Sequence, residues 1–366
     1  MGHVSATLSV AAGGGGDALA ALIVGRARGQ DNPRQQMVAS FSWDRYLIDP
    51  TPGPRTVEDF SDLHQPARHV WEVTGRSQLR SGGTSGLSVL ATHTDARFFL
   101  LDPSDGVAGL RRQLDALAQY VSASAITLVD VGGDIAARGD EPNLLSPLAD
   151  SMALAAVAGL PVGSEVVVAG PGLDGELPEA YVRSQMGTAG HHQQRVSSSD
   201  AKNYVAALDH HPSEATALLS AAAIGIEGKA EIRDSAALVP LGAASADLLV
   251  ASCGAILANN SVASSLAPTR SFAEAEQVTR AICGRTELDH ERAKAAAAKH
   301  QVRDDPPSDE IRRRIEAYRS AAARRGADLV SFRRLTEAIG LHRYDPALIR
   351  AAAGELAYDD VPLCRI

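Results

Sequence analysis

The sequence has few cysteines and few aromatic residues. Its three cysteines, Cys253, Cys283 and Cys364, lie far apart in 366 residues and show no CxxC spacing. That pattern indicates neither a zinc site nor a disulfide framework, and it fits a reducing compartment. Aromatic residues make up only 4% of the chain, so the core must consist mainly of Ala, Val, Leu and Ile.

Long apolar runs and clustered cations are also scarce. The longest uncharged stretch, residues 248–269, contains Asn259, Asn260 and several serines, which makes it a poor membrane span. The net charge is −9, and basic residues gather only in the C-terminal segment, so binding to nucleic acid or to an anionic membrane is disfavoured. The chain starts without the basic and apolar pattern of a signal peptide. We expect a cytoplasmic protein with no membrane partner and no nucleic-acid partner.

One phosphate-binding motif and one nucleophile motif are absent as well. The chain contains no G-x-x-x-x-G-K-[ST] sequence, and residues 83–86, which read GTSG, lack the spacing of G-x-S-x-G. The pairs His191-His192 and His210-His211 are poor metal sites, because adjacent side chains point in different directions on a regular element. We expect these histidines to lie on the surface.

Short apolar stretches alternate with helical patterns along the first 300 residues. This alternation predicts an α/β fold with a mostly parallel, doubly wound, Rossmann-like sheet. The expected strands are residues 6–12, 36–41, 68–73, 97–101, 125–129 and 165–169, with edge strands at 230–233 and 238–241. The expected helices are residues 17–28, 106–120, 146–160 and 271–283, and residues 177–225 are expected to be mostly helical.

A charged, proline-containing stretch at residues 304–308 divides the chain. We assign residues 1–300 to an α/β ligand-binding, catalytic domain and residues 301–366 to an appended Arg-rich helical region. Helices are expected there at residues 309–325 and 331–339. Acids interleave with the arginines, so we expect a solvated face or one that forms a homo-oligomer.

Three predicted strands run directly into loops rich in glycine and acid, at residues 13–17, 130–141 and 170–176. Because the carboxyl ends of neighbouring parallel strands lie at one edge of a sheet, we expect these loops to share one crevice for a ligand. The residues expected to contact the ligand are Gly13, Gly14, Gly15, Gly16, Asp17, Asp44, Gly132, Gly133, Glu141, Ser146, Asp150, Gly172, Asp174 and Glu176.

The glycine run after the first strand allows two interpretations. Residues 13–18 satisfy G-x-G-x-x-A, the dinucleotide fingerprint, with Asp44 as the acid that would bind a ribose. Asp17, however, would occupy the place of a bound phosphate at the helix N-terminus and repel its charge. It suits a hydroxyl, an amine or a bridging divalent cation. The alternative is that the glycines only make a tight turn and that Asp17 only caps the helix.

Several blocks of sequence, in this order, resemble a prokaryotic family described as domain of unknown function 1152. The resemblance spans about residues 6 to 292 and does not include the C-terminal segment. It implies that the glycine and acid loops form one shared site, and it names no reaction. The blocks are AGGGGD (12–17), WDRYLIDPTPGP (43–54), DVGGD (130–134), GDEP (139–142), SPLAD (146–150), GPGLDGEL (170–177) and RTELD (285–289).

Several acids without an obvious nucleophile favour an enzyme that hydrolyses or transfers a group on a small polar metabolite with a nucleotide, nucleoside or sugar-phosphate portion. We expect Asp134 and Asp140 to form the reactive pair, with Asp17 and Asp174 orienting the ligand. Mg²⁺ or Ca²⁺ could be held by these carboxylates. One alternative is an NAD(P)- or flavin-dependent oxidoreductase that uses the glycine run with Asp44. Another is a non-catalytic nucleotide-binding regulator whose Arg-rich tail meets a partner.

Overall fold

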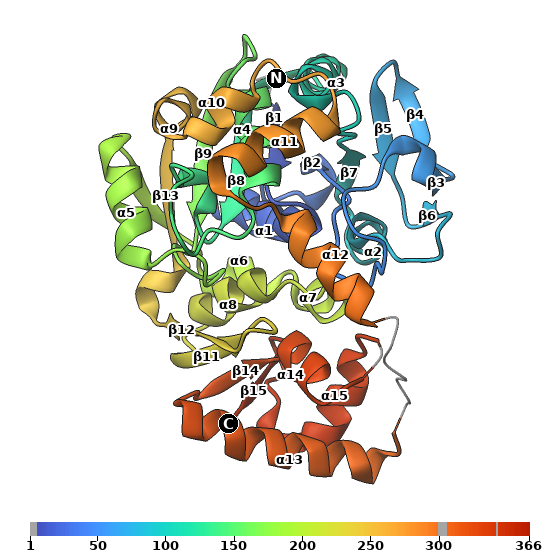
Figure 1. Ribbon diagram of the computed structural model, residues 1–366, viewed down its shortest axis with the longest axis vertical. Helices are drawn as coiled ribbons and strands as arrows, with labels where there is room; N and C mark the ends of the chain where they lie inside the picture. The colour runs from blue at the N-terminus through green and yellow to red at the C-terminus, as the bar shows by residue number, and fades with distance from the viewer. Residues whose placement is uncertain (1–5, 299–305, 342) are drawn as a thin grey trace.

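A large, mostly parallel sheet forms the centre of the protein (Figure 1). The computed structural model describes residues 6–298, 306–341 and 343–366. Nine strands lie in the order β10-β13-β9-β8-β1-β2-β7-β5-β4, and the five middle strands are parallel. These five are β1 (Ala6–Ala11), β2 (Met37–Ser40), β7 (Arg97–Leu100), β8 (Ala123–Val131) and β9 (Gly163–Ala169).

The parallel strands are mostly apolar because helices cover both faces of the sheet. In β8, Ile126 and Leu128 pack into one core, whereas Val129 and Val131 pack into the other. All of the central strands coincide with predicted ones. The order along the sheet reverses between β1 and β8, because β2 and β7 lie on one side of β1 while β8 and β9 lie on the other.

Antiparallel strands border the parallel core on both sides, and the prediction missed part of them. β13 (Asp247–Ser252) pairs with β9 and β10 (His192–Arg195), while β5 (Val70–Val73) pairs with β7 and β4 (His64–Ala67). β10 lies in the segment predicted to be mostly helical. All four of its residues are exposed, so it lacks the apolar pattern that identifies a strand.

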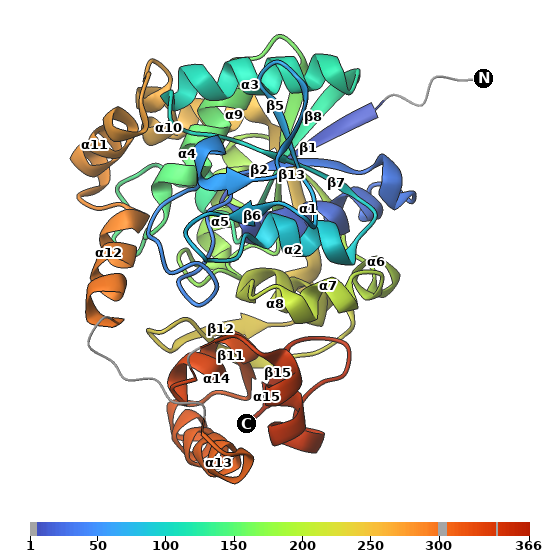
Figure 2. The ribbon, with the colours of Figure 1, turned by 90° about the vertical axis from the view of Figure 1, so that its right-hand side faces the viewer.

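Helices cover the two faces in separate layers, which Figure 2 shows above and below the sheet. The upper layer packs around one core and the lower layer around the other. The upper helices are α3 (Gly106–Tyr120), α4 (Pro147–Val157), α9 (Cys253–Asn259), α10 (Ser261–Leu266) and α11 (Phe272–Cys283). The lower helices are α1 (Gly15–Ala27), α2 (Gly86–His93), α6 (Ser198–Lys202), α7 (Val205–His210) and α8 (Glu214–Ala223).

A second, four-stranded sheet lies below the lower helices and joins the C-terminal segment to the rest of the chain (Figures 1 and 2). Its order is β12-β11-β14-β15, with α13, α14 and α15 on its outer side. The C-terminal segment is therefore only partly helical, which corrects the prediction of a helical region. The bounds are β11 (Gly228–Ile232), β12 (Ala237–Leu241), α13 (Ser308–Arg325), β14 (Leu329–Ser331), α14 (Phe332–Ala338), α15 (Pro346–Ala353) and β15 (Leu363–Arg365).

A buried acid holds this second sheet to its helices. Glu231 of β11 is 0% exposed, and its carboxylate pairs with Arg325 at 2.8 Å and with Arg334 at 3.1 Å. Tyr318 of α13 donates a further hydrogen bond to it. Residues of α13 and α14 thus complete the environment of a strand that comes almost a hundred positions earlier.

The remaining elements connect these layers. α12 runs along the edge of the molecule between α11 and the C-terminal segment (Figures 1 and 2). No helix among the described residues is long and apolar enough to cross a membrane. These elements are α5 (Glu179–Thr188), α12 (Glu287–Ala298), β3 (Phe60–Ser61), β6 (Gln78–Leu79) and the 3₁₀ helices η1 (Pro33–Gln35), η2 (Val57–Asp59), η3 (Asp134–Ala136), η4 (Ala243–Ala246) and η5 (Gly354–Leu356).

Candidate functional site

The loops after β1, β8 and β9 meet at the carboxyl edge of the central sheet. These three strands are neighbours, and the strand order reverses between β1 and β8 at this point, where open α/β sheets bind ligands. A cavity of about 340 Å³ lies there, between the sheet edge, α12 and the second sheet. Its charged and histidine lining residues are Asp17, Asp44, Arg45, Asp130, Asp134, Asp150, Asp174, Glu176, His211, Glu214, Arg233, Asp234, Glu287, His290, Glu291 and Arg333.

Six acids of the cavity form two groups of three. Within each group, one carboxylate oxygen of every residue lies within 4.8 Å of the others. Five of the six residues are at most 9% exposed, and Asp17 is half-buried. The first group is Asp17, Asp130 and Asp150, and the second is Asp134, Asp174 and Glu176. All of them come from the predicted loops and the helix that follows.

Five of these carboxylates form no ion pair within the described part of the chain. Among the described residues, no Lys, Arg or His forms an ion pair with Asp17, Asp130, Asp134, Asp150 or Asp174. Two oxygens, Oδ1 of Asp150 and Oδ2 of Asp174, are buried without any hydrogen-bond partner. A buried acceptor without a partner costs free energy. One such atom lies in each group of three.

Burial and mutual repulsion make these acids unusually weak. Burial raises the pKa of Asp17 to about 7, and burial together with Glu176 raises the pKa of Asp174 to about 7. Burial and the neighbouring acids hold the pKa values of Asp130, Asp134 and Asp150 well above the usual range. A cation in the cavity would stabilise the ionised carboxylates and so offset both effects.

Glu176 differs from the other five because the protein already neutralises it. Arg233 donates to its Oε1 at 2.8 Å, and the backbone amides of Leu145 and Ser146 donate to its Oε2 at 2.7 and 3.0 Å. Burial raises the pKa of Glu176, but Arg233 and these hydrogen bonds lower it by more. The pKa of Glu176 therefore lies below its ordinary value. The group of Asp17, Asp130 and Asp150 therefore has the greater need for an external cation.

The glycine run packs against the protein's own side chains. A Cβ on Gly15 would lie 2.6 Å from Oδ1 of Asp44, and one on Gly14 would lie 2.9 Å from the carbonyl oxygen of Trp43. Gly14 also has a φ of 111°, which side chains rarely adopt. Gly13 and Gly16 line the cavity, whereas Gly14 and Gly15 do not.

The later glycines follow the same pattern. A Cβ on Gly132 would lie 2.3 Å from Cγ of Asp174, one on Gly133 would meet Val182, and one on Gly172 would meet the backbone of Glu179. None of these three lines the cavity. These glycines let the acidic loops pack closely, and the expectation that they contact a ligand stays a prediction.

Acidic side chains occupy the helix N-termini that face this edge. Asp17 Oδ2 accepts from the amide of Gly13 at 2.8 Å, before α1, and Asp44 Oδ2 accepts from the amide of Gly86 at 2.9 Å, at the start of α2. Glu287 accepts from the amides of Leu148 and Ala149 at the start of α4, both at 2.9 Å. Helix N-termini are where a phosphate would otherwise bind. The glycine turn is therefore not an open phosphate cradle.

Asp140 and Glu141 lie outside the cavity. The side chain of Asp140 is 75% exposed and its Oδ1 lies 3.5 Å from Arg138. Glu141 accepts from the amides of Arg138 and Gly139 at 2.8 and 2.9 Å. The chain turns after η3 and carries both residues toward α10, where Gly139 packs on Val262. The expected reactive pair of Asp134 and Asp140 does not form. Asp134 instead accepts from the hydroxyl of Ser146 at 3.2 Å.

The structure adds residues that the sequence prediction did not select. Arg45, His211, Arg233, Glu287 and Arg333 all line the cavity. Arg45 follows Asp44 in the block at residues 43–54, and Glu287 lies in the block at residues 285–289. Their place in these blocks is the signal that could have identified them. The other three come from regions with no recognisable motif.

His211 is notable for its lack of partners. It is 3% exposed, and neither ring nitrogen has a hydrogen-bond partner among the residues that the structure describes. Burial, with a smaller effect of Arg45, lowers its pKa to about 4. It is therefore a neutral imidazole at the cavity wall, not the surface residue that was expected.

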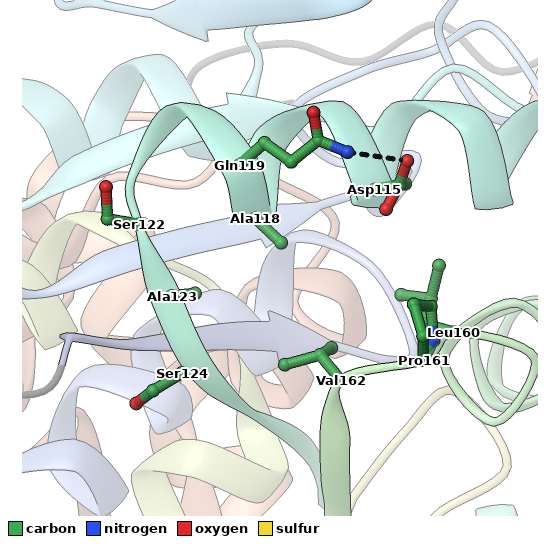
Figure 3. Close-up of a pocket in the computed structure, with 9 residues that line it drawn as sticks. All are labelled: Asp115, Ala118, Gln119, Ser122, Ala123, Ser124, Leu160, Pro161 and Val162. Atoms are coloured by element: carbon green, nitrogen blue, oxygen red, sulfur yellow. Dashed lines mark hydrogen bonds between the residues drawn. The ribbon is translucent and has the colours of Figure 1, made fainter.

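A second cavity of about 530 Å³ lies at the opposite edge of the sheet (Figure 3). It is bordered by the end of α3, the start of β8 and the turn before β9. Its only carboxylate, Asp115, accepts from the amide of Gln119 at 2.9 Å. No group of acids or cations converges there, so we do not regard it as the functional site.

Comparison with known proteins gives one family. A model described as "Protein of unknown function (DUF1152)" matches residues 8–295. The match includes all of the acidic loops and ends before the segment that contains Arg333. No curated protein and no solved structure matches the chain.

Proposed function

The chain belongs to the DUF1152 family, and from the geometry of its cavity we propose that it is an enzyme that uses a divalent cation to hydrolyse or transfer a group on a small polar metabolite. The metabolite carries a nucleotide, nucleoside or sugar-phosphate portion. The five parallel strands lie in the order β7-β2-β1-β8-β9. Numbered along the chain this is 3-2-1-4-5, so we also assign the sheet to the Rossmann-like class.

One observation carries the proposal: a group of three acids, Asp17, Asp130 and Asp150, has no cation among the described residues and leaves Oδ1 of Asp150 buried without a partner. Oxygens bound to one Mg²⁺ or Ca²⁺ lie about 2.0–2.6 Å from the ion. Two opposite ligands are then up to roughly 5 Å apart, and the three oxygens of each group lie within 4.8 Å of one another. The donor set consists of oxygens only, which suits Mg²⁺, Mn²⁺ or Ca²⁺.

The second group of acids supplies a candidate base. Burial and Glu176 raise the pKa of Asp174 to about 7, so this carboxyl exchanges a proton readily at neutral pH. Asp134, in the same group, faces the hydroxyl of Ser146. The cation would neutralise developing negative charge and lower the pKa of a bound water. Asp134 and Asp174 would orient that water and accept its proton.

The geometry favours this reading over an oxidoreductase. Asp44, the acid expected to bind a ribose, is 8% exposed and accepts from the amide of Gly86. Asp17 closes the turn where a pyrophosphate would lie. A regulator without catalysis would show binding but no turnover, so kinetics distinguish it.

Isothermal titration calorimetry with Mg²⁺, Mn²⁺ and Ca²⁺ tests the cation site directly. We expect the wild-type protein to bind at least one of these ions, and Asp150→Asn to weaken that binding at least tenfold, about 1.4 kcal/mol. Asp140→Asn is the matched control, because Asp140 is an exposed acid outside the cavity. Its affinity should equal that of the wild type.

Two outcomes would contradict the proposal. One is the absence of binding by all three ions, and the other is equal affinity in the wild type and Asp150→Asn. Where an ion binds, a screen of nucleotides and sugar phosphates with that ion present identifies the reaction.

A further inference from the structure

Three arginines face the cavity from parts of the chain that are distant in sequence. Arg45 follows β2, Arg233 follows β11 directly, and Arg333 lies on α14. They are close enough to influence one another: burial lowers the pKa of Arg45, and Arg333 and then Arg233 lower it further. Like charges gather in this way at a cost unless anions lie among them, and the protein supplies Glu176 to Arg233 and Glu214 to Arg333.

Two of the arginines are held in place by neighbours. Arg233 donates from Nε to the carbonyl oxygen of Asp174 at 2.6 Å and from Nη2 to Glu176 at 2.8 Å. Arg333 pairs with Glu214 at 2.9 Å, and its side chain is only 10% exposed. Its buried Nε has no hydrogen-bond partner. Both guanidinium groups are therefore fixed before a ligand arrives.

Arg45 has no partner of its own. Among the described residues, no acid lies within ion-pair distance of Arg45 and none of its side-chain nitrogens makes a hydrogen bond. Arg45 lines the same cavity as Asp17 and His211, and its charge acts to lower the pKa of both. It is exposed at the cavity wall, and an unpaired guanidinium there is a ready donor for an anion.

We propose that Arg45, Arg233 and Arg333 form a subsite for the phosphoryl group of the substrate, in the same cavity as the acids. Guanidinium groups offer paired N–H donors that match the oxygens of phosphate. Three of them suit a dianionic group better than a single carboxylate. A phosphoryl oxygen can face the arginines while another faces a cation on the acids. The inference rests on the proposed function only for the contact between the phosphoryl group and the cation.

The C-terminal segment supplies part of this subsite. The family model matches residues 8–295, so Arg333 lies outside it while Arg45 and Arg233 lie inside it. Arg333 is held by Glu214 of α8, and Ser331 of β14 donates a further hydrogen bond to the same acid. The segment therefore bears on which phosphorylated metabolite the cavity accepts.

Calorimetric titration with inorganic phosphate and with pyrophosphate tests the subsite, once with Mg²⁺ present and once in a metal chelator. We expect the wild type to bind at least one probe, and Arg45→Gln to weaken that binding at least tenfold. Arg45→Lys, which keeps the charge but loses the fork of donors, should lie between them. Arg312→Gln is the control, because Arg312 is an exposed arginine of the C-terminal segment whose nearest acid is 4.0 Å away. It should behave as the wild type.

Separate results decide separate claims. Arg45→Gln should unfold at the same temperature as the wild type in the absence of any ligand, which shows that the variant is folded. If Mg²⁺ binds but neither probe binds, or if the probes bind Arg45→Gln as tightly as the wild type, the subsite is refuted and the cation site stands. If phosphate binding depends on Arg45 while no cation binds, the subsite stands and the proposed function falls. Equal affinity for acetate and phosphate would refute the choice of a phosphoryl group.

Discussion

The buried imidazole of His211 shows how a single side chain marks a ligand position. Both ring nitrogens lack partners although the residue is 3% exposed, and leaving a buried polar atom unpaired costs about 1–3 kcal/mol. The ring lies beside Asp44, since a Cβ on Gly86 would approach His211 Nε2 at 2.7 Å and Asp44 Oδ1 at 2.4 Å. A ligand that reaches this wall would satisfy the imidazole.

His211→Phe separates stability from binding. We expect the variant to unfold at the same temperature as the wild type or a higher one, because an apolar ring replaces unpaired polar atoms of similar size. Binding of the metabolite identified by the ligand screen should weaken. Thermal unfolding and calorimetry measure the two effects, with the exposed His192→Phe as control. A large fall in melting temperature, with ligand affinity unchanged, would show that His211 is structural.

Asp134 and Asp140 show which residue assignments could be made from the sequence. Asp134 was selected because it follows a buried strand and a glycine pair, and it lines the cavity. Asp140 was selected because it is near in sequence, but six positions of irregular chain can end anywhere. The turn of η3 and the packing of Gly139 on Val262 decide its place, and neither leaves a signal in the sequence.

The start of α1 illustrates how an element depends on close backbone packing. Gly15 is the first residue of this helix, and its φ is not positive. Alanine would therefore suit its backbone, and helix propensity favours alanine over glycine by about 1 kcal/mol. A Cβ there would nevertheless lie 2.6 Å from Asp44 Oδ1. Any loss of stability can then be assigned to that contact.

Gly15→Ala should lower the free energy of unfolding by about 1–3 kcal/mol, as overpacking of a close contact does. Asp44 must move, and its hydrogen bond to the amide of Gly86 at the start of α2 is then lost. Gly187→Ala in α5 is the matched control, since no atom lies within 4 Å of a Cβ there. It should raise stability slightly. Chemical denaturation of both variants measures the difference, and equal effects would refute the packing argument.

The length of an element decides how well the sequence predicts it. The spacing of Val107, Leu110, Leu114 and Leu117 predicted α3, and all four residues are buried within Gly106–Tyr120. β14 and β15 have three residues each, which is too short to show an alternating pattern. The pairing of β14 with β11, and of β15 with β14, depends on tertiary contacts such as those of Glu231. The C-terminal segment was therefore predicted as helical only.

The second sheet contains strands from both sides of the division of the chain at about residue 300. β11 pairs in parallel with β14, and Glu231 is buried against Arg325 and Arg334. Proline and charge in the sequence mark a linker, but they do not reveal that the strands on its two sides share a sheet. Sequence patterns report local structure, whereas this pairing spans almost a hundred positions.

Protonation of the cavity acids should govern how the stability of the whole molecule depends on pH. Burial holds the pKa of several cavity acids above the value of 3.8 for an unperturbed Asp, with Asp17 and Asp174 at about 7. Between pH 4 and pH 7 these acids therefore bind more protons in the folded protein than in the unfolded chain. They outnumber His211, whose pKa is lowered to about 4 and which contributes in the opposite direction. Stability must then fall as the pH rises through this range.

Without a divalent cation, we expect the melting temperature to be lower at pH 8 than at pH 5.5. Ionised carboxylates bind the cation, so Mg²⁺ or Mn²⁺ should raise the melting temperature more at pH 8 than at pH 5.5.

Asp150→Asn removes one buried charge and should flatten the pH dependence while reducing the effect of the cation. Asp140→Asn, at an exposed site, should keep the wild-type profile. Differential scanning calorimetry at both pH values, with and without the ion, measures all four curves. Two results would contradict the account of the cavity as a cation site formed by acids. One is a cation-free protein that is more stable at pH 8 than at pH 5.5, and the other is a cation effect that is equal at both pH values.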